Sequence, residues 1–225
     1  MHIEFDIPEL PTQPEVFSNY WARVLFIRSP SSRYEINALT STYVRLVEAA
    51  FKEYKDGTER LRDFWLTHSS VNLGAMHRSI SHFESCIFDI NRAINCFRKL
   101  RGDRHNHRVA LALRREKFSF AHDLIANRVR DVRNEIHHLE DSILSGIVMQ
   151  GQNFALRPEG LELPHQTEKN QTVKTLDRLT IGAHELLFSE LAQWLTEMGG
   201  AVSRIAEALP SHTIQAKEHL QSTDW

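Results

Sequence analysis

One short run, Arg133-Asn134-Glu135-Ile136-His137-His138, brings together the side chains best suited to chemistry in this chain. An imidazole titrates near neutral pH and can therefore give or take a proton, whereas a guanidinium is a permanent cation whose planar fork matches a phosphate group. Metal-free cleavage of RNA needs a group that accepts the 2′-hydroxyl proton, a group that protonates the leaving oxygen, and positive charge against the phosphate. The run supplies all three kinds of group.

The run lies in a segment with the apolar spacing of a helix. Apolar residues recur there every three or four positions, at Ala121, Ile125, Val129, Val132, Ile136, Leu139 and Ile143. We therefore predict one uninterrupted helix from Phe118 to about Ser145, with this stripe buried. Arg133 flanks the stripe, His137 lies one turn beyond it, and His138 leaves from another side of the helix.

An arginine followed directly by asparagine, with a histidine five positions after the arginine (Arg133, Asn134 and His138), resembles the R-N-x-x-x-H signature of the HEPN superfamily. These are small all-helical domains, many of them metal-independent ribonucleases that serve as toxins or antiviral effectors. The resemblance implies a homodimer with a shared cleft in which Arg133 contacts phosphate, His138 takes part in acid–base catalysis and Asn134 orients them. His137 is the alternative catalytic histidine, because helix geometry places it nearer Arg133.

The resemblance also implies partners and a product. Attack by the internal 2′-hydroxyl of RNA would leave a 2′,3′-cyclic phosphate, and a cognate antitoxin or regulatory protein would restrain the activity. The relative whose motif continues H-x-Tyr and is silenced on that tyrosine is matched less well, because Glu140 stands at this position. A second hypothesis is a non-catalytic, HEPN-like dimerisation or partner-binding module in a toxin–antitoxin or defence system. A third keeps Arg133 and His137 as residues of a solvated helix face.

The charge is distributed unevenly along the chain. The formal net charge is −2, yet eleven of the 27 Lys and Arg residues and only four of the 29 Asp and Glu residues lie between Arg98 and Arg133. A basic segment inside an otherwise acidic chain favours a polyanion partner, although a solvated charged loop is an equally good interpretation. The predicted RNA-binding residues are Arg104, Arg108, Arg114, Arg115, Arg128 and Arg130.

We expect no metal site and no cofactor. His105 and His107 form an H-x-H pair to which His122, His137 or His138 could add ligands, but no cysteine or carboxylate stands at a recognisable ligand spacing. The chain also lacks the glycine-rich phosphate loops, the H-E-x-x-H run and the G-x-S-x-G elbow. Glu84 and Asp89 could face the cleft and position a histidine, or they could be ordinary surface acids.

The remaining periodicity predicts an all-α, up-and-down helical bundle with two long central helices. One helix begins at Ser32 and ends at Asp56-Gly57, and Thr58 caps a further turn or two. The other runs from Val71 to Leu100, with an unbroken seam at Leu73, Met76, Ile80, Phe83, Ile87, Ile90, Ile94 and Phe97. Before them we predict a short strand at residues 2–7 and a helix at 15–28.

After Gly146 the pattern changes. Residues 147–163 are typical of a small β-hairpin with Pro158-Glu159-Gly160 as its turn, and an ordered loop is the alternative. Residues 164–175 then form a linker, and a last helix covers 176–209. We therefore expect a single domain over 1–225, with a core of 32–145 and 176–209 and an insertion at 146–175.

Cys86 and Cys96 are too far apart along one helix to bridge each other, so we expect free thiols. The chain has neither a signal-peptide pattern nor an apolar run long enough to span a bilayer, which favours a cytoplasmic protein without a membrane partner.

Overall fold

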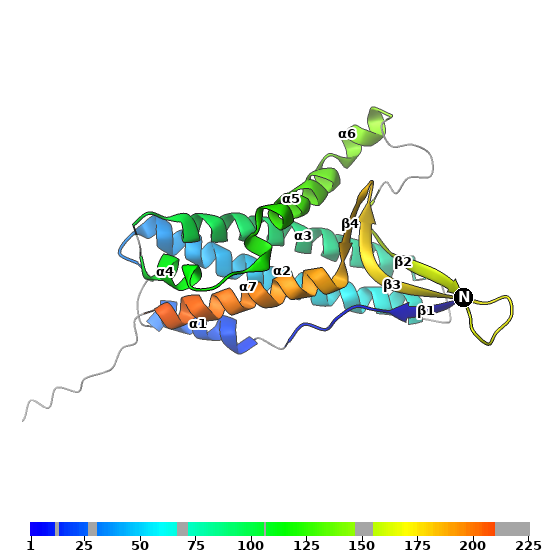
Figure 1. Cartoon of the computed structure of the whole chain (residues 1–225), viewed down its shortest axis with the longest axis horizontal. Coiled ribbons are helices and arrows are strands. Elements are labelled where there is room, and N and C mark those ends of the chain that lie inside the picture. The colour runs from blue at the N-terminus through cyan, green and yellow to red at the C-terminus, as the bar shows by residue number, and fades with distance from the viewer. Residues whose placement is uncertain (12–13, 27–30, 67–71, 106, 147–154, 210–225) are drawn as a thin grey trace, which may run out of the picture.

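The computed structural model of the chain describes residues 1–11, 14–26, 31–66, 72–105, 107–146 and 155–209. These residues are mostly helical, and a small mixed sheet packs at one end of the helices (Figure 1). Helices and strands contribute to one hydrophobic core, which extends from Ile7 to Leu209. No helix within the described ranges combines the length and apolar character needed to cross a bilayer.

Two long antiparallel helices form the centre of the fold, α2 (Tyr34–Leu66) and α3 (Leu73–Gly102). Tyr43 packs its ring against Phe97 near one end of the pair, and the thiol of Cys86 donates a hydrogen bond to the carbonyl of Ala50 farther along. Both cysteines are free, as expected. The prediction of two long central helices is confirmed.

The expected end of the first helix at Gly57 is wrong, because α2 continues without a break to Leu66. Gly57 lies where α2 and α3 approach closely: a Cβ atom there would come within 3.0 Å of the Phe83 ring. Ser79 donates a hydrogen bond to the Gly57 carbonyl at 2.8 Å, and Thr58 bonds back to Tyr54 at 2.8 Å. Glycine serves here as a contact residue between helices, which offsets its low helix propensity.

The apolar seam of α3 is buried from Phe83 to Phe97, as predicted, whereas Leu73 at its start is 59% exposed. Helix α7 (Phe188–Ala208) covers the α2–α3 pair, and the hydroxyl of Tyr43 donates a hydrogen bond to the Met198 carbonyl at 3.2 Å. Two further helices flank α7, namely α1 (Pro14–Phe26) and α4 (Arg108–Arg114). The prediction of α1 is therefore confirmed.

The sheet is built around β3 (Thr172–Ile181) as its central strand. Strand β2 (Arg157–Pro164) pairs with β3 along one edge in antiparallel fashion. On the other edge, β1 (His2–Phe5) pairs in parallel with the first half of β3, and β4 (His184–Leu187) pairs antiparallel with its second half. The predicted strand at the N-terminus is therefore present.

The hairpin was predicted at the wrong residues, and strands β3 and β4 were not predicted. Pro158-Glu159-Gly160 lies inside β2 rather than in a turn, and the connection of the hairpin spans 165–171. The predicted linker at 164–175 and the start of the predicted last helix at 176 belong to β3 instead. Most of the predicted first arm, 147–154, lies outside the described residues. Only Leu176, Leu179 and Ile181 are buried in β3. Its sequence therefore lacks the strict alternation of apolar and polar residues that would distinguish a strand from the start of a helix.

Gly160 marks a register shift between β2 and β3. The pairing skips from Glu159 with Arg178 to Gly160 with Leu176. A Cβ atom at residue 160 would lie 1.6 Å from the backbone oxygen of Thr175, so the two strands can approach this closely only at a glycine.

We predict opposite effects for alanine at two glycines. Gly160→Ala forces β2 and β3 apart and should lower the free energy of unfolding by about 1–3 kcal/mol. Gly200→Ala is the control: it lies within α7 with open space around it, and it should raise the free energy of unfolding by about 0.5–1 kcal/mol. Urea unfolding followed by circular dichroism measures both. An unchanged stability of the Gly160 variant would contradict the pairing described here.

Candidate functional site

The motif helix is interrupted, contrary to the prediction of one helix from Phe118 to Ser145. A 3-10 turn, η1 (Ser119–Ala121), precedes α5 (Asp123–His137), and a shorter helix, α6 (Leu139–Leu144), follows. His138 separates the two helices with φ −105° and ψ 17°. The charge pattern favours a new helix after His138. His137 lies in the last turn of α5, whereas Glu140 and Asp141 lie in the first turn of α6, where the helix dipole favours negative charge.

The base of α5 is held firmly, whereas its end leaves the body of the protein. Val129 and Val132 are buried, and the side chain of Glu135 lies against the turn at Gly182 between β3 and β4. Figure 1 shows α5 rising from the bundle and α6 projecting beyond it. The predicted buried stripe becomes more exposed toward its end: Ile136 and Leu139 are partly buried, and Ile143 is 46% exposed.

Arg133 is held by two neighbours. Its Nη1 donates a hydrogen bond to Oδ1 of Asn134 at 2.9 Å, and its Cζ lies 5.4 Å from the ring centroid of Phe88 on α3. A guanidinium over an aromatic face is attracted by the ring quadrupole. Among the described residues, no carboxylate lies within ion-pair distance of Arg133. Asn134 thus bonds to Arg133, and its role in a site stays a prediction.

Both histidines of the motif lie beside this arginine. The ring of His137 meets Phe88 edge-on at 6.4 Å, and the rings of His137 and His138 are 5.0 Å apart. The side chain of His138 is 60% exposed, and its Nδ1 lies 3.8 Å from a carboxylate oxygen of Asp141. His137 therefore shares the ring of Phe88 with Arg133, and His138 lies beside His137 at the end of α5.

Phe88 is the residue that sequence reasoning missed. It lies off the buried seam of α3 and is only partly buried, so its apolar spacing gave no sign of a role. Its distance along the chain from Arg133 also hid the contact. The only available signal was an aromatic side chain outside a seam that was already complete.

An open depression of about 410 Å³ adjoins Phe88 and is lined by Ser81, Glu84, Ser85 and Asp89. Burial raises the pKa of Glu84. It also raises the pKa of Asp89, although the nearby Arg92 and Arg45 act in the opposite direction. Within the described part of the chain neither carboxylate bonds to His137 or His138, so these acids add negative charge beside Phe88 and do not orient an imidazole.

Two of the predicted RNA-binding arginines lie on α5, but both have acidic partners. Arg128 forms a bidentate pair with Glu190 at 2.7 and 2.8 Å and also donates to the carbonyl of Glu185. It therefore ties α5 to β4 and to the start of α7. Arg130 is exposed and lies 3.4 Å from Asp131.

The other four, Arg104, Arg108, Arg114 and Arg115, belong to α4 and its flanks. In Figure 1, α4 lies at the end of the bundle away from α6, so the structure does not bring these residues to the motif. Arg114 donates hydrogen bonds to the carbonyls of Arg101 and Asp103, and it lines an open depression of about 370 Å³ together with Arg98 and Arg101.

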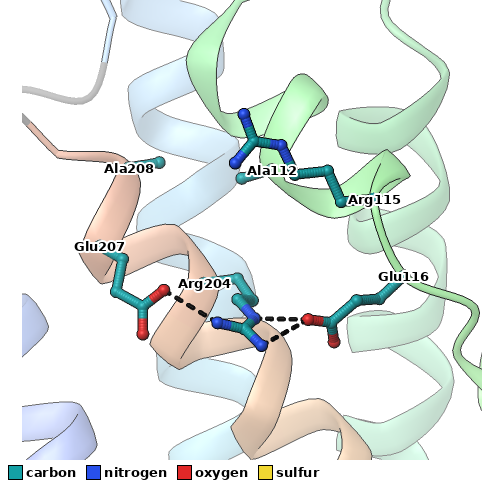
Figure 2. Close-up of a pocket in the computed structure, with 6 residues that line it drawn as sticks. All are labelled: Ala112, Arg115, Glu116, Arg204, Glu207 and Ala208. Atoms are coloured by element: carbon teal, nitrogen blue, oxygen red, sulfur yellow. Dashed lines mark hydrogen bonds and ion pairs between the residues drawn. The ribbon is translucent and has the colours of Figure 1, made fainter.

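Arg115 lies at another depression near α4, of about 350 Å³ (Figure 2). Arg204 also lines this depression, and its guanidinium donates hydrogen bonds to Glu116 at 2.6 Å and to Glu207 at 3.1 Å. These two carboxylates raise the pKa of Arg204 above its usual value and occupy its donors. This depression therefore offers less free positive charge than its arginines suggest.

The histidines considered as metal ligands do not gather in the described structure. His107 instead begins α4, where its Nδ1 accepts a hydrogen bond from the backbone of Ala110 at 3.1 Å. The cluster of potential ligands found among the described residues is a different one, His2, His165 and Glu168.

No protein-family model matches the chain, and no curated protein or solved structure is significantly similar to it. The site is therefore interpreted from its own geometry and from the motif.

We predict a pH-dependent gain in stability when the acids beside Phe88 are neutralised. A carboxyl group whose pKa is higher in the folded state than in the unfolded state weakens folding once the pH rises above the unfolded value. Glu84→Gln should therefore raise the free energy of unfolding at pH 7 more than at pH 4, and Asp89→Asn should act in the same direction. Urea titrations at the two pH values measure this. A gain of equal size at both would contradict the assigned burial.

Proposed function

We propose that this protein is a metal-independent endoribonuclease of HEPN type, which acts on RNA in the cytoplasm as a toxin or antiviral-defence effector. The observation that carries the proposal is the arrangement at Phe88: an arginine without a carboxylate partner among the described residues, bonded to Asn134, lies over the ring, and His137 meets the ring edge-on with the exposed His138 beside it. Such a guanidinium, next to imidazoles that can give or take a proton, suits a phosphodiester in reaction.

The proposed reaction is an internal transfer. A histidine accepts the proton of the 2′-hydroxyl as its oxygen bonds to phosphorus, the bond to the 5′-oxygen breaks, and a second histidine protonates that oxygen. Arg133 stabilises the negative charge that develops on the phosphoryl oxygens. The products are a 2′,3′-cyclic phosphate and a free 5′-hydroxyl, and no oxidant or metal ion is required.

One chain presents one such arginine, so we propose that two chains form a shared site across a two-fold axis. The support is the uncovered end of the motif helices, where Ile143 is 46% exposed and Leu144 is 85% exposed. Burial of these apolar side chains by a second copy of the chain would stabilise the dimer. In this proposal His138 matters more than His137, because it belongs to the motif and lies at the exposed junction of α5 and α6.

A non-catalytic, HEPN-like module that dimerises or binds a partner is the second candidate. The observation that favours it is the number of motif-segment arginines already engaged within the chain, with Arg128 paired to Glu190 and Arg130 close to Asp131. Both candidates are compatible with a cognate antitoxin or regulatory protein that binds the same face.

The first experiment compares wild type with Arg133→Ala, His138→Ala and His137→Ala, followed by growth and by cleavage of purified RNA. Removal of the phosphate-binding cation or of a proton-transfer group should reduce cleavage about 10²- to 10⁴-fold. Arg60→Ala and His122→Ala are matched controls, because both residues are exposed and lie away from Phe88. Phosphatase-resistant 3′-ends on the products would identify the cyclic phosphate.

If wild type free of any inhibitor is harmless and leaves RNA intact, the nuclease proposal fails and the binding module remains. If it cleaves RNA but both Arg133→Ala and His138→Ala match it, the activity stands and the site assignment fails.

The dimer is tested by a charge placed on the exposed arm. Leu144→Glu should shift the protein from dimer to monomer in sedimentation and lower RNA cleavage in parallel, because a carboxylate would be buried at the contact. Leu161→Glu is the control, since Leu161 is 60% exposed on β2 and far from α6 in the chain. A wild-type chain that sediments as a monomer at the concentrations where it cleaves RNA would refute the shared site.

A further inference from the structure

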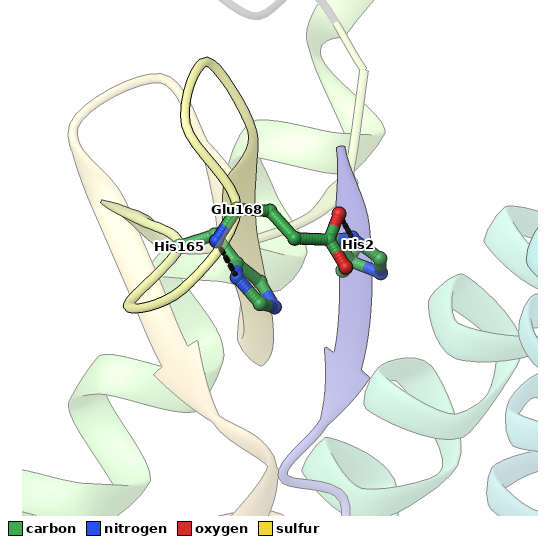
Figure 3. A group of neighbouring side chains, drawn as sticks. All are labelled: His2, His165 and Glu168. Carbon is green, nitrogen blue, oxygen red and sulfur yellow. Dashed lines mark hydrogen bonds and ion pairs between the residues drawn. The ribbon is translucent and has the colours of Figure 1, made fainter.

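Three potential metal ligands meet at the end of the sheet, away from Phe88 and the motif (Figure 3). His2 lies on β1, and His165 and Glu168 lie in the connection between β2 and β3. Nε2 of His2 is 3.2 Å from a carboxylate oxygen of Glu168, and the two imidazole rings are 4.7 Å apart. One donor atom from each of the three residues lies within 4.8 Å of the others.

Strand pairing brings these residues together from distant parts of the chain. Position 2 pairs with Val173 on one edge of β3, and Pro164 pairs with Thr172 at the opposite edge. The start of β1 and the β2–β3 turn therefore flank the same end of β3. A contact between residues 166 positions apart, as for His2 and Glu168, has no signature in local spacing.

The turn itself is well defined. The backbone N–H of His165 donates to the carbonyl of Gln171 at 2.8 Å, and Asn170 takes the left-handed conformation with φ 68°. Nδ1 of His165 accepts hydrogen bonds from the backbone of Glu168 at 3.0 Å and of Thr167 at 3.3 Å. These bonds fold the turn so that the Glu168 side chain reaches across to His2.

The donor set matches a particular class of cation. Two imidazoles and one carboxylate suit Zn²⁺, which is commonly held by three protein ligands and a water molecule. Ligand distances of about 2.0–2.2 Å place neighbouring donors of a tetrahedral ion roughly 3.3–3.5 Å apart. The His2–Glu168 pair, at 3.2 Å, is close to this spacing, and the partly exposed side chains can rotate to close the remaining gap.

We propose that His2, His165 and Glu168 bind one Zn²⁺ ion, with water at the fourth position. Coordination by His165 replaces its two backbone hydrogen bonds at Nδ1, or moves the ring proton to that atom, so the turn rearranges when the ion binds. The bound ion joins β1 to the β2–β3 turn and takes no part in the chemistry proposed at Arg133.

The test uses the full chain after removal of any affinity tag. Zn²⁺ is titrated calorimetrically, and Co²⁺ is titrated as a coloured substitute whose visible absorption reports four-coordinate geometry. Wild type should bind one equivalent, whereas His2→Gln and Glu168→Gln should each weaken binding at least 10-fold. His122→Gln, an exposed histidine at the start of α5, should bind like wild type.

Two further readouts separate this site from other histidines. Saturating Zn²⁺ should raise the thermal midpoint of wild type but not that of Glu168→Gln, and binding should weaken as the pH falls, because protons compete with the ion for the ligand atoms. Glu168→Gln lies on an exposed turn, and its circular dichroism spectrum should match wild type. Failure of wild type to bind Zn²⁺, or undiminished binding by both variants, overturns the proposal.

Discussion

The close contact between α2 and α3 at Gly57 is the constraint on which the rest of the structure depends. With no side chain at residue 57, the ring of Phe83 can lie directly against the backbone of α2, and Ser79 can bond to the Gly57 carbonyl. The two helices then remain in contact along much of their length, with Tyr43 packed against Phe97 at the far end. The α2–α3 pair packs against α7 on one side, where Tyr43 bonds to Met198. On another side, Phe88 of α3 contacts Arg133 of α5.

Helix positions were predictable from the sequence where a stripe faced this contact. The intervals of three and four along α3 indicated which side is buried, and that side is buried from Phe83 to Phe97. Prediction failed where a residue acts through a distant contact. Gly57 resembles a helix stop unless its neighbour Phe83 is known, and Gly160 resembles a turn unless the Thr175 backbone opposite it is known. Most of the sheet was not predicted, because it too depends on distant contacts. The central strand β3 pairs with β1 near the N-terminus as well as with its sequence neighbours β2 and β4.

In the candidate site, too, features set by local spacing were predictable, and features that depend on distant contacts were not. The catalytic role of Arg133, Asn134 and the two histidines stays a prediction. Local spacing was sufficient to place them near one another, because they lie within one short run of the sequence. It was insufficient to find Phe88, which holds Arg133 from another helix, or the break at His138, which arises where tertiary support for α5 ends. Charge counting was the weakest guide. It grouped Arg104, Arg108, Arg114 and Arg115 with the motif, whereas the fold places α4 elsewhere and Arg114 bonds to backbone carbonyls.

The break at His138 also changes what the spacing between Arg133 and the histidines means. In one continuous helix, Arg133 and His138 would be held at a fixed angle, with the imidazole on a different side from the guanidinium. Here Arg133 and His137 share the fixed face over Phe88, while His138 belongs to the junction with α6 and is oriented mainly by its neighbours His137 and Asp141. In the proposed site, this cation and the exposed imidazole at the helix junction would be half of the catalytic arrangement. The exposed Ile143 and Leu144 lie a few residues beyond that imidazole, so a second chain that covered them would also approach the place where the other half is needed.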